Sequence, residues 1–267
     1  MHSIAFKIGS LAIHWYGIMV ALGFLAGLWT ASRRARLAGI TAEQIYDLGP
    51  WLIIGGILGG RVLYVISYWR EDFAANPFPE IFMVQHGGLV FYGGLIGATG
   101  IGMLYIYWKK LPLWKMADIL APSVALGCVF GRIGCLLNGC CFGRACNLPW
   151  AISFPPTLNS SGMLVPHETN GVPVHPTQVY DSLLNLVLYC FLAWLFRRKK
   201  FDGQIFALYL VGYAALRSFV EYFRGDYPVH YLGGIATPAQ VISLGVIAGG
   251  LLLLWLLPRP EPKQKPA

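Results

Sequence analysis

Charged residues are scarce in this chain. Asp, Glu, Lys and Arg together make up 12% of its 267 residues, whereas soluble domains carry roughly 25%. Hydrophobic residues make up 56%, and glycine occurs 32 times. This composition excludes an ordinary cytosolic enzyme, a disordered chain and a coiled coil, and it indicates a membrane protein with several spans. A long-period repeat, which many secondary transporters contain, is also missing.

The chain lacks the pattern of a cleavable leader as well. A signal peptide carries a positive stretch before its apolar core. No such stretch precedes the first apolar segment, so we expect that segment to stay in the mature protein. A helix needs about 20 mainly apolar residues to cross a hydrocarbon core of about 30 Å. On this criterion we predict an all-α integral membrane protein, one domain over residues 1–257, with seven transmembrane helices. They cover residues 15–31, 48–69, 88–108, 117–137, 179–196, 204–223 and 238–257.

Lys and Arg are distributed unevenly between the two sides of the expected membrane. Thirteen of the 20 lie in alternate connections, and the other connections hold four. Because basic residues accumulate on the cytoplasmic side, we predict an external N-terminus and a cytoplasmic C-terminus. The formal net charge of +8 then reflects topology rather than a nucleic-acid partner. The thirteen residues are Arg33, Arg34, Arg36, Lys109, Lys110, Lys115, Arg197, Arg198, Lys199, Lys200, Arg259, Lys263 and Lys265.

The longest external connection, residues 143–176, is rich in Pro, Asn and Ser and nearly free of charge. Loops of this length are usually functional or disordered. The aromatic and proline content favours an ordered segment, so we expect a small extracytoplasmic cap between spans four and five. Residues 258–267 contain four prolines and mixed charges, and we expect a disordered cytoplasmic tail there.

Charged residues inside a span must face a protein interior, a water-filled cavity or a lipid headgroup. The charged residues inside the predicted spans include Arg61, Arg132, Arg217 and Glu221. Arg217, Glu221 and Arg224 follow a spacing of four and three residues, which places them along one stripe of a helix. A structural salt bridge between Arg217 and Glu221 is one interpretation, but two arginines for one carboxylate leave a positive charge over. Arg132 and Arg224 lie near the outer ends of their spans. Because guanidinium groups bind phosphate in a bidentate manner, a cavity lined by these arginines would suit an anionic phospholipid.

Two glycine-rich runs carry the other candidates. GRIGCLLNGCCFG (131–143) contains Cys135, Cys140 and Cys141, with Cys146 just beyond. Their spacing matches neither a zinc-type CxxC pair nor a thioredoxin motif, so we expect no metal there, and a disulfide on the oxidising outer side stays open. HGGLVFYGGLIG (86–97) begins with His86, which is either a proton acceptor near neutral pH or an anchor at the membrane interface.

Six motifs occur in one order along the chain: HWYG (14–17), HGGLVFYGGLIG, GRIGCLLNGCCFG, LPWA (148–151), HPTQ (175–178) and RSFVEYFR (217–224). Together with the topology they resemble the prolipoprotein diacylglyceryl transferase family, from about residue 10 to residue 257. The resemblance implies a seven-helix enzyme of the bacterial inner membrane with a periplasmic cap. Such enzymes move a diacylglyceryl group from phosphatidylglycerol to the lipobox cysteine thiol in the signal peptide of a prolipoprotein, forming a thioether and releasing glycerol phosphate. Because the donor is already activated, the resemblance implies no metal ion, nucleotide or other cofactor.

The resemblance also assigns roles to residues. Arginines held near the phosphate can stabilise the negative charge that develops as the leaving group departs. The catalytic candidates are Arg132, Arg217, His86 and Tyr92. The positions implied for substrate binding are Tyr16, Arg132, Asn138, Gly143, Arg217, Glu221 and Arg224.

Three positions depart from the pattern of many members, which have histidine in place of Tyr92 and asparagine and glutamate in place of Cys135 and Cys140. A tyrosine with a pKa of about 10 is a poor base, so a fixed histidine-base mechanism does not transfer to this chain. The acceptor thiol reacts as a thiolate, and we expect the arginine charges to activate it, with His86 as the alternative base. The other hypotheses are a paralogue with an altered lipid or acceptor, a lipid or anion transporter, and a redox or metal protein built on the cysteines.

Overall fold

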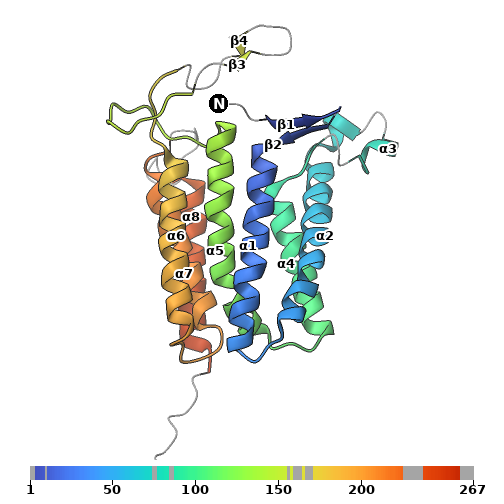
Figure 1. Ribbon diagram of the computed structural model, residues 1–267, viewed down its shortest axis with the longest axis vertical. Helices are drawn as coiled ribbons and strands as arrows, with labels where there is room; N and C mark the ends of the chain where they lie inside the picture. The colour runs from blue at the N-terminus through green and yellow to red at the C-terminus, as the bar shows by residue number, and fades with distance from the viewer. Residues whose placement is uncertain are drawn as a thin grey trace, which may run out of the picture. The chain divides into compact units, whose positions relative to one another are not determined.

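The structure is a computed structural model that describes residues 4–9, 11–73, 77–83, 87–154, 157–158, 164–165, 171–224 and 237–258. All seven segments predicted to cross a membrane are helical (Figure 1). Five of these helices, α1, α2, α5, α6 and α8, are long and apolar enough to cross a membrane. The architecture is therefore that of a helical integral membrane protein. The seven helices are α1 (Trp15–Leu37), α2 (Ala42–Ser67), α4 (Phe91–Trp108), α5 (Leu113–Asn138), α6 (Thr177–Phe196), α7 (Gln204–Glu221) and α8 (Pro238–Leu256).

Short elements lie between the long helices, and two hairpins among them were not predicted. Strand β1 (Ile4–Ile8) pairs antiparallel with β2 (Leu11–His14), around a turn in which Gly9 has a φ of +60°. Strand β3 (Thr157–Leu158) pairs with β4 (Leu164–Val165) inside the predicted cap. Short apolar runs such as β1 and β2 carry too little periodicity to distinguish a strand from a helix or loop. The remaining elements are a π-helical turn, η1 (Trp69–Phe73), and α3 (Pro77–Glu80).

Local capping explains where several helices begin. Thr41 and Gln44 form a reciprocal capping box at the start of α2, and Thr237 and Gln240 form another at the start of α8. Each box satisfies two backbone N–H groups that have no partner within the helix. Helix α2 consequently begins six residues before the predicted apolar window, which started at residue 48.

The chain divides into two compact units, one of residues 1–31 and 117–267, the other of residues 32–116. In the second unit α2 packs against α4 through facing glycines. A Cβ atom added to Gly55 would lie 2.6 Å from the carbonyl oxygen of Gly97, and Gly59 faces Gly93 and Gly97 in the same way. Small residues allow helices to approach closely where both are surrounded by lipid. The close approach expected from the glycine runs is confirmed for this pair.

In the first unit, polar side chains link neighbouring helices. Ser123 of α5 donates a hydrogen bond of 2.7 Å to the carbonyl of Gly27 in α1. Ser182 of α6 donates one of 3.2 Å to the carbonyl of Val129 in α5. Helix α7 packs against both α6 and α8, as the neighbouring orange and red ribbons in Figure 1 show. These links fix α5 and α6, on which much of the candidate site lies.

A buried carboxylate, Asp118 of α5, anchors the start of α7. It accepts hydrogen bonds of 2.9 Å from the backbone N–H groups of Gly203 and Phe206. It also lies 2.9 Å from Nζ of Lys199. Although burial acts in the opposite direction, hydrogen bonds to Asp202 and Asp118 raise the pKa of Lys199 above its ordinary value. Lys199 thus joins two helices, a role beyond the topology anchor expected from the sequence.

The predicted cap is described only in part. Val174 forms bridges with Ala145 and Ile152, and the ring of Phe154, which is 2% exposed, packs against Phe142. Residues 155–156, 159–163 and 166–170 of the cap and residues 259–267 of the predicted tail lie outside the described part of the chain.

Candidate active site

The GRIGCLLNGCCFG run forms the end of α5 and the loop that follows it. Gly139 has a φ of +75°, a conformation that glycine adopts without steric cost. The N–H of Cys140 then donates to the carbonyl of Cys135 at 3.1 Å, and the N–H of Gly139 donates to that of Leu136 at 3.2 Å. This pair of bonds is the Schellman arrangement that ends many helices. It turns the chain back, so that Cys140 lies beside Cys135.

Helices α6 and α7 hold this loop in place. The hydroxyl of Thr177 donates to the carbonyl of Cys141 at 2.8 Å, and the amide of Gln178 donates to that of Cys140 at 2.7 Å. Two residues after Cys141, Gly143 pairs with Arg224 in an antiparallel bridge just beyond the end of α7. Three of the motifs quoted above therefore meet in one unit, although they lie far apart in the sequence.

Gly143 has a packing role at this junction. A Cβ atom at this position would lie 2.5 Å from the carbonyl oxygen of Phe223, 2.7 Å from Cβ of His175 and 2.8 Å from Cγ2 of Thr177. Every larger residue would therefore push the loop away from α6 and α7. The structure thus explains glycine at position 143 by the close contact of the loop with α6 and α7. The resemblance implied a part in substrate binding.

Three arginines and two carboxylates form the charged centre of the first unit. Nε of Arg132 lies 2.7 Å from Oδ2 of Asp181. Arg217 pairs with Glu221, and Nε of Arg224 lies 4.0 Å from the same carboxylate. The hydroxyl of Tyr213 is within electrostatic range of Asp181, Arg132 and Arg217. The two ion pairs therefore belong to one cluster, and we call these five charged residues the arginine cluster.

The arginine cluster keeps a net positive charge. The side chains of Asp181 and Glu221 are 5% and 0% exposed, whereas those of Arg132 and Arg217 are 21% and 15% exposed. The carboxylates thus lie inside, and the guanidinium groups lie nearer the surface. Three positive and two negative charges leave one positive charge over. The salt bridge considered for Arg217 and Glu221 is present, and it is compatible with binding of an anion.

Asp181 is the residue that the sequence analysis missed. It lies inside the predicted span 179–196 and is a charged residue in an apolar segment, the same signal that identified Arg132. The amide of Asn185, one turn later in α6, donates to Oδ1 of Asp181 at 2.7 Å. Asp181 is thus held by α6 itself and orients Arg132 from α5.

A hollow of about 420 Å³ with apolar walls lies next to the loop. Its lining includes Trp150, His175, Tyr180 and Phe223. The hydroxyl of Tyr180 accepts a hydrogen bond of 2.8 Å from the indole of Trp150. Burial and the charge of Arg144 lower the pKa of His175, which keeps its ring neutral near pH 7. The hollow therefore presents aromatic surface and no charge of its own.

Comparison with known proteins identifies the family. The profile described as prolipoprotein diacylglyceryl transferase matches residues 3–256. The chain is 36% identical to the phosphatidylglycerol–prolipoprotein diacylglyceryl transferase of Bordetella bronchiseptica, over 96% of this chain and 95% of the relative. It is 37% identical to the protein of the same name from Clostridium tetani, over 95% and 96% of the two chains. This chain belongs to the prolipoprotein diacylglyceryl transferase family.

Two further positions that the resemblance assigned for substrate binding in this family lie beside the end of α5. A Cβ atom on Gly134 would lie 3.1 Å from Cδ2 of Tyr16, so the tyrosine packs directly on α5. Tyr16 is also within electrostatic range of Arg132. The amide of Asn138 lies 3.7 Å from Sγ of Cys140 and its side chain is exposed. The structure thus places Tyr16 near Arg132 and Asn138 beside Cys140, and their roles stay predictions.

The other two predicted catalytic residues, His86 and Tyr92, do not belong to the described part of the first unit. His86 lies outside the described residues. Tyr92 lies in α4 of the second unit; the residue is 63% exposed, and its ring contacts the ring of Phe91. Their catalytic roles stay predictions.

Arg61, the other arginine expected inside a span, has a structural explanation within the second unit. Its guanidinium group donates to the carbonyls of Ile81 at 2.9 Å, Gly87 at 2.8 Å and Gly88 at 3.1 Å. It also lies over the rings of Tyr64 and Phe73. An arginine inside a span requires such partners. Arg61 therefore holds the connection between α3 and α4 and is not a candidate for binding phosphate.

Proposed function

We propose that this chain transfers the diacylglyceryl group of phosphatidylglycerol to the cysteine thiol of a prolipoprotein lipobox and releases glycerol phosphate. The names of its relatives state this donor and this acceptor class. The observation that carries the proposal is the arginine cluster, whose charge balance is positive and whose guanidinium groups are only partly covered. An anionic headgroup is the ligand that such a cluster suits.

In the proposed reaction, the acceptor sulfur, as a thiolate, attacks the glyceryl carbon that carries the phosphate. The C–S bond forms while the C–O bond breaks, and the electron pair of that bond leaves with glycerol phosphate. Arg132 and Arg217 are proposed to bind the phosphate oxygens and to stabilise the charge that develops on them. Asp181 and Glu221 orient the two arginines, so that little reorganisation is needed during the reaction.

Glu221 has a second proposed contact. Its Oε1 atom is buried and has no hydrogen-bond partner among the described residues. Such an atom is costly to leave unpaired. A glycerol hydroxyl of the headgroup would satisfy it, and this would distinguish phosphatidylglycerol from lipids without that hydroxyl.

The proposed topology follows from the distribution of basic residues. We propose seven spans in the bacterial inner membrane, with the N-terminus and a cap of residues 143–176 in the periplasm and residues 258–267 in the cytoplasm. The catalytic domain would then comprise residues 1–257, with the arginine cluster near the periplasmic surface. The lipobox cysteine would approach from that side.

Purified protein supplied with phosphatidylglycerol and a lipobox peptide tests the activity. We expect the peptide mass to rise by one diacylglyceryl group, and a peptide with serine in place of the cysteine to stay unchanged. Arg132→Ala and Arg217→Ala should abolish the product, while Arg197→Ala, at an exposed arginine beyond α6, should leave it. Absence of thioether from the unmodified chain would refute the proposed function.

A further inference from the structure

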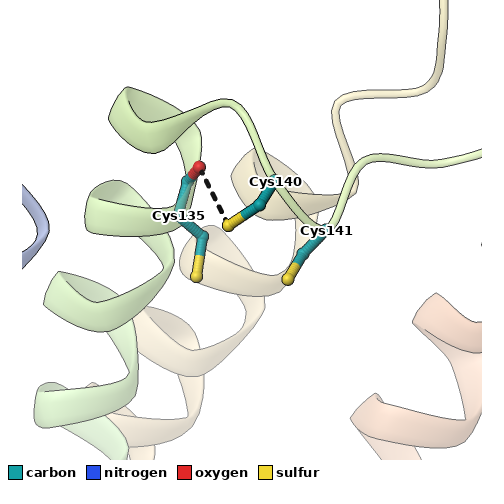
Figure 2. A group of neighbouring side chains, drawn as sticks. All are labelled: Cys135, Cys140 and Cys141. Carbon is teal, nitrogen blue, oxygen red and sulfur yellow. Dashed lines mark hydrogen bonds between the residues drawn. The ribbon is translucent and has the colours of Figure 1, made fainter. Parts of the chain in front are cut away.

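Three thiols converge at the loop that follows α5. The sulfur atoms of Cys135, Cys140 and Cys141 all lie within 4.8 Å of one another. Figure 2 shows them around a common space between the last turn of α5 and the loop. All six cysteines of the chain are free, and among the described residues no other group of potential metal ligands is arranged in this way. We call these three residues the thiol triad.

The backbone creates the thiol triad without help from a ligand. The Schellman turn places Cys140 beside Cys135, as described above. Cys141 has a φ of +62°, which is uncommon for a residue with a side chain and marks a constrained position. Thr177 and Gln178 hold the carbonyls of Cys141 and Cys140. The three sulfur atoms are therefore presented by a fixed frame.

The spacing suits a tetrahedral metal ion. A Zn–S distance of about 2.3 Å implies a sulfur–sulfur separation of about 3.8 Å in a tetrahedral site. The thiol triad has separations of at most 4.8 Å, so small side-chain rotations would be enough to close it. Catalytic zinc sites commonly combine three protein ligands with one open position. No fourth His, Cys, Asp or Glu joins the triad in the described part of the chain.

The neighbouring charges favour such a site. Zn²⁺ with three thiolates carries one net negative charge. Arg224 and Arg132 are the cations that act on Cys141. The negative charge of a metal–thiolate group would therefore lie near arginines that are already present.

We propose that Cys135, Cys140 and Cys141 bind a zinc ion through three thiolates and that the acceptor thiol occupies the fourth position. The second part rests on the proposed function. At Tyr92, Cys135 and Cys140 this chain departs from the family pattern, and the sequence leaves open which group activates the acceptor thiol. The proposed zinc ion would be that group. The sequence alone predicts no metal site, because the spacing of the cysteines resembles no zinc motif. The end of helix α5 is what brings the three thiols together.

The chemistry balances without a further reactant. The acceptor thiol loses its proton to water as it binds the metal, because coordination lowers the pKa of a thiol. The bound thiolate attacks the glyceryl carbon, the C–S bond forms, and the C–O bond breaks with its electron pair leaving on glycerol phosphate. The thioether is a weaker ligand than the thiolate, so the product dissociates and the ion stays on the triad.

Metal content tests the first part. Protein purified under reducing conditions without chelator should contain about one zinc ion per chain, and cobalt exchanged into it should show thiolate-to-cobalt charge-transfer absorption. Single changes Cys135→Ser, Cys140→Ser and Cys141→Ser should lose the ion, whereas Cys146→Ser and Cys190→Ser, outside the triad, should keep it.

Thermal unfolding of each variant identifies loss of the ion through misfolding. A double change Cys140→Ser/Cys141→Ser provides a second measurement if one single variant fails to fold. Absence of metal and of cobalt binding, or a disulfide within the triad found by differential alkylation of the unmodified chain, would overturn the proposal.

The acceptor tests the second part. A lipobox peptide should change the cobalt spectrum, and the same peptide with serine should not. Removing the metal should lower thioether formation at least tenfold, and added zinc should restore it. If metal-free protein keeps full activity, the metal role is overturned while the proposed function stands. If the metal and the peptide bind but no thioether forms with any metal, the site stands and the proposed function fails.

Discussion

At the residue scale, the charged groups inside the helices are matched to one another rather than scattered. Arg132 meets Asp181, Arg217 meets Glu221, and Asp118 meets Lys199. Burying an unpaired charge is costly, and pairing reduces the cost. The pairs differ in one respect that bears on function. Asp118 has backbone donors in addition to its lysine, whereas the arginine cluster leaves a positive charge uncompensated.

The first prediction concerns the support of Arg132. Asp181→Asn keeps the size of the side chain and removes its charge, so Arg132 loses the group that orients it. We expect the rate of thioether formation to fall about tenfold to a hundredfold, because small misplacements of a catalytic group have effects of this size. Initial rates over a range of phosphatidylglycerol concentrations check this, and a fall in kcat larger than the change in KM would indicate positioning.

Asp47→Asn, at an exposed carboxylate of α2, serves as the matched control and should keep the rate of the unmodified chain. Thermal unfolding should show that Asp181→Asn remains folded. A variant that is folded and fully active would show that Asp181 does not position Arg132.

At the element scale, each unit depends on a few close contacts between helices. Glycines bring α2 and α4 together in one unit, and hydrogen bonds from Ser123 and Ser182 link α1, α5 and α6 in the other. In lipid, the hydrophobic effect does not favour one helix pair over another. Packing and hydrogen bonds therefore decide which helices associate. Even small side-chain changes at these helix–helix contacts should therefore lower the stability of the folded chain.

Gly97→Ala tests the glycine contact. An added Cβ would meet the carbonyl of Gly55 and Cα of Gly59, both backbone atoms that cannot rotate away. We expect a loss of about 1–3 kcal/mol, the usual cost of overpacking, seen as a lower Tm in detergent. Gly100→Ala, in the same helix with no atom within 4 Å of the added carbon, should be neutral or stabilising. Equal melting temperatures for the two variants would show that α2 and α4 do not depend on this contact.

Asp118→Asn tests the link between α5 and α7. The variant loses the ion pair with Lys199 and weakens the bonds to the N–H groups of Gly203 and Phe206. We expect a loss of about 1–3 kcal/mol, between that of a helix cap and that of a buried ion pair. Asp202→Asn, at the exposed partner of the same lysine, should cost less.

The ion pair of Asp118 with Lys199 also predicts how stability depends on pH. Because the pKa of Lys199 is raised in the folded chain, its stabilising effect is complete below the unfolded value of about 10.4. It is lost as the pH rises through the folded value. Melting temperatures measured across this alkaline range should fall more steeply for the unmodified chain than for Asp118→Asn, and parallel curves would argue against the pair.

At the scale of the whole molecule, the basic residues determine the predicted orientation. Fusions at the two termini test it in bacterial cells. Alkaline phosphatase, which is active only in the periplasm, should be inactive at the C-terminus and active when joined to the N-terminus through an exported leader. Green fluorescent protein should fluoresce at the C-terminus. The reverse pattern would invert the topology and place the arginine cluster on the wrong side for a lipobox cysteine.

The positions of the seven helices could be predicted from the sequence, because a lipid solvent demands long apolar runs and each run is a local property. Arg132, Arg217 and Glu221 could be identified in the same way, since a charge in an apolar run is visible without a fold. The hairpin of β1 and β2 could not, because short runs carry little periodicity. The ion pair of Arg132 with Asp181 could not either, because a partner on another helix depends on how the helices pack.

The amino-acid sequence by itself determined that this chain is a helical membrane protein of the prolipoprotein diacylglyceryl transferase family with unusual charges in its spans. Only the tertiary structure decided which of those charges are paired, that Gly143 is needed for close approach, and that three cysteines of unremarkable spacing share one space. The physical reason is that composition indicates a membrane protein and that the local apolar runs give the positions of its helices. The meeting of side chains depends on helix ends and interhelical contacts, which join residues far apart in the chain.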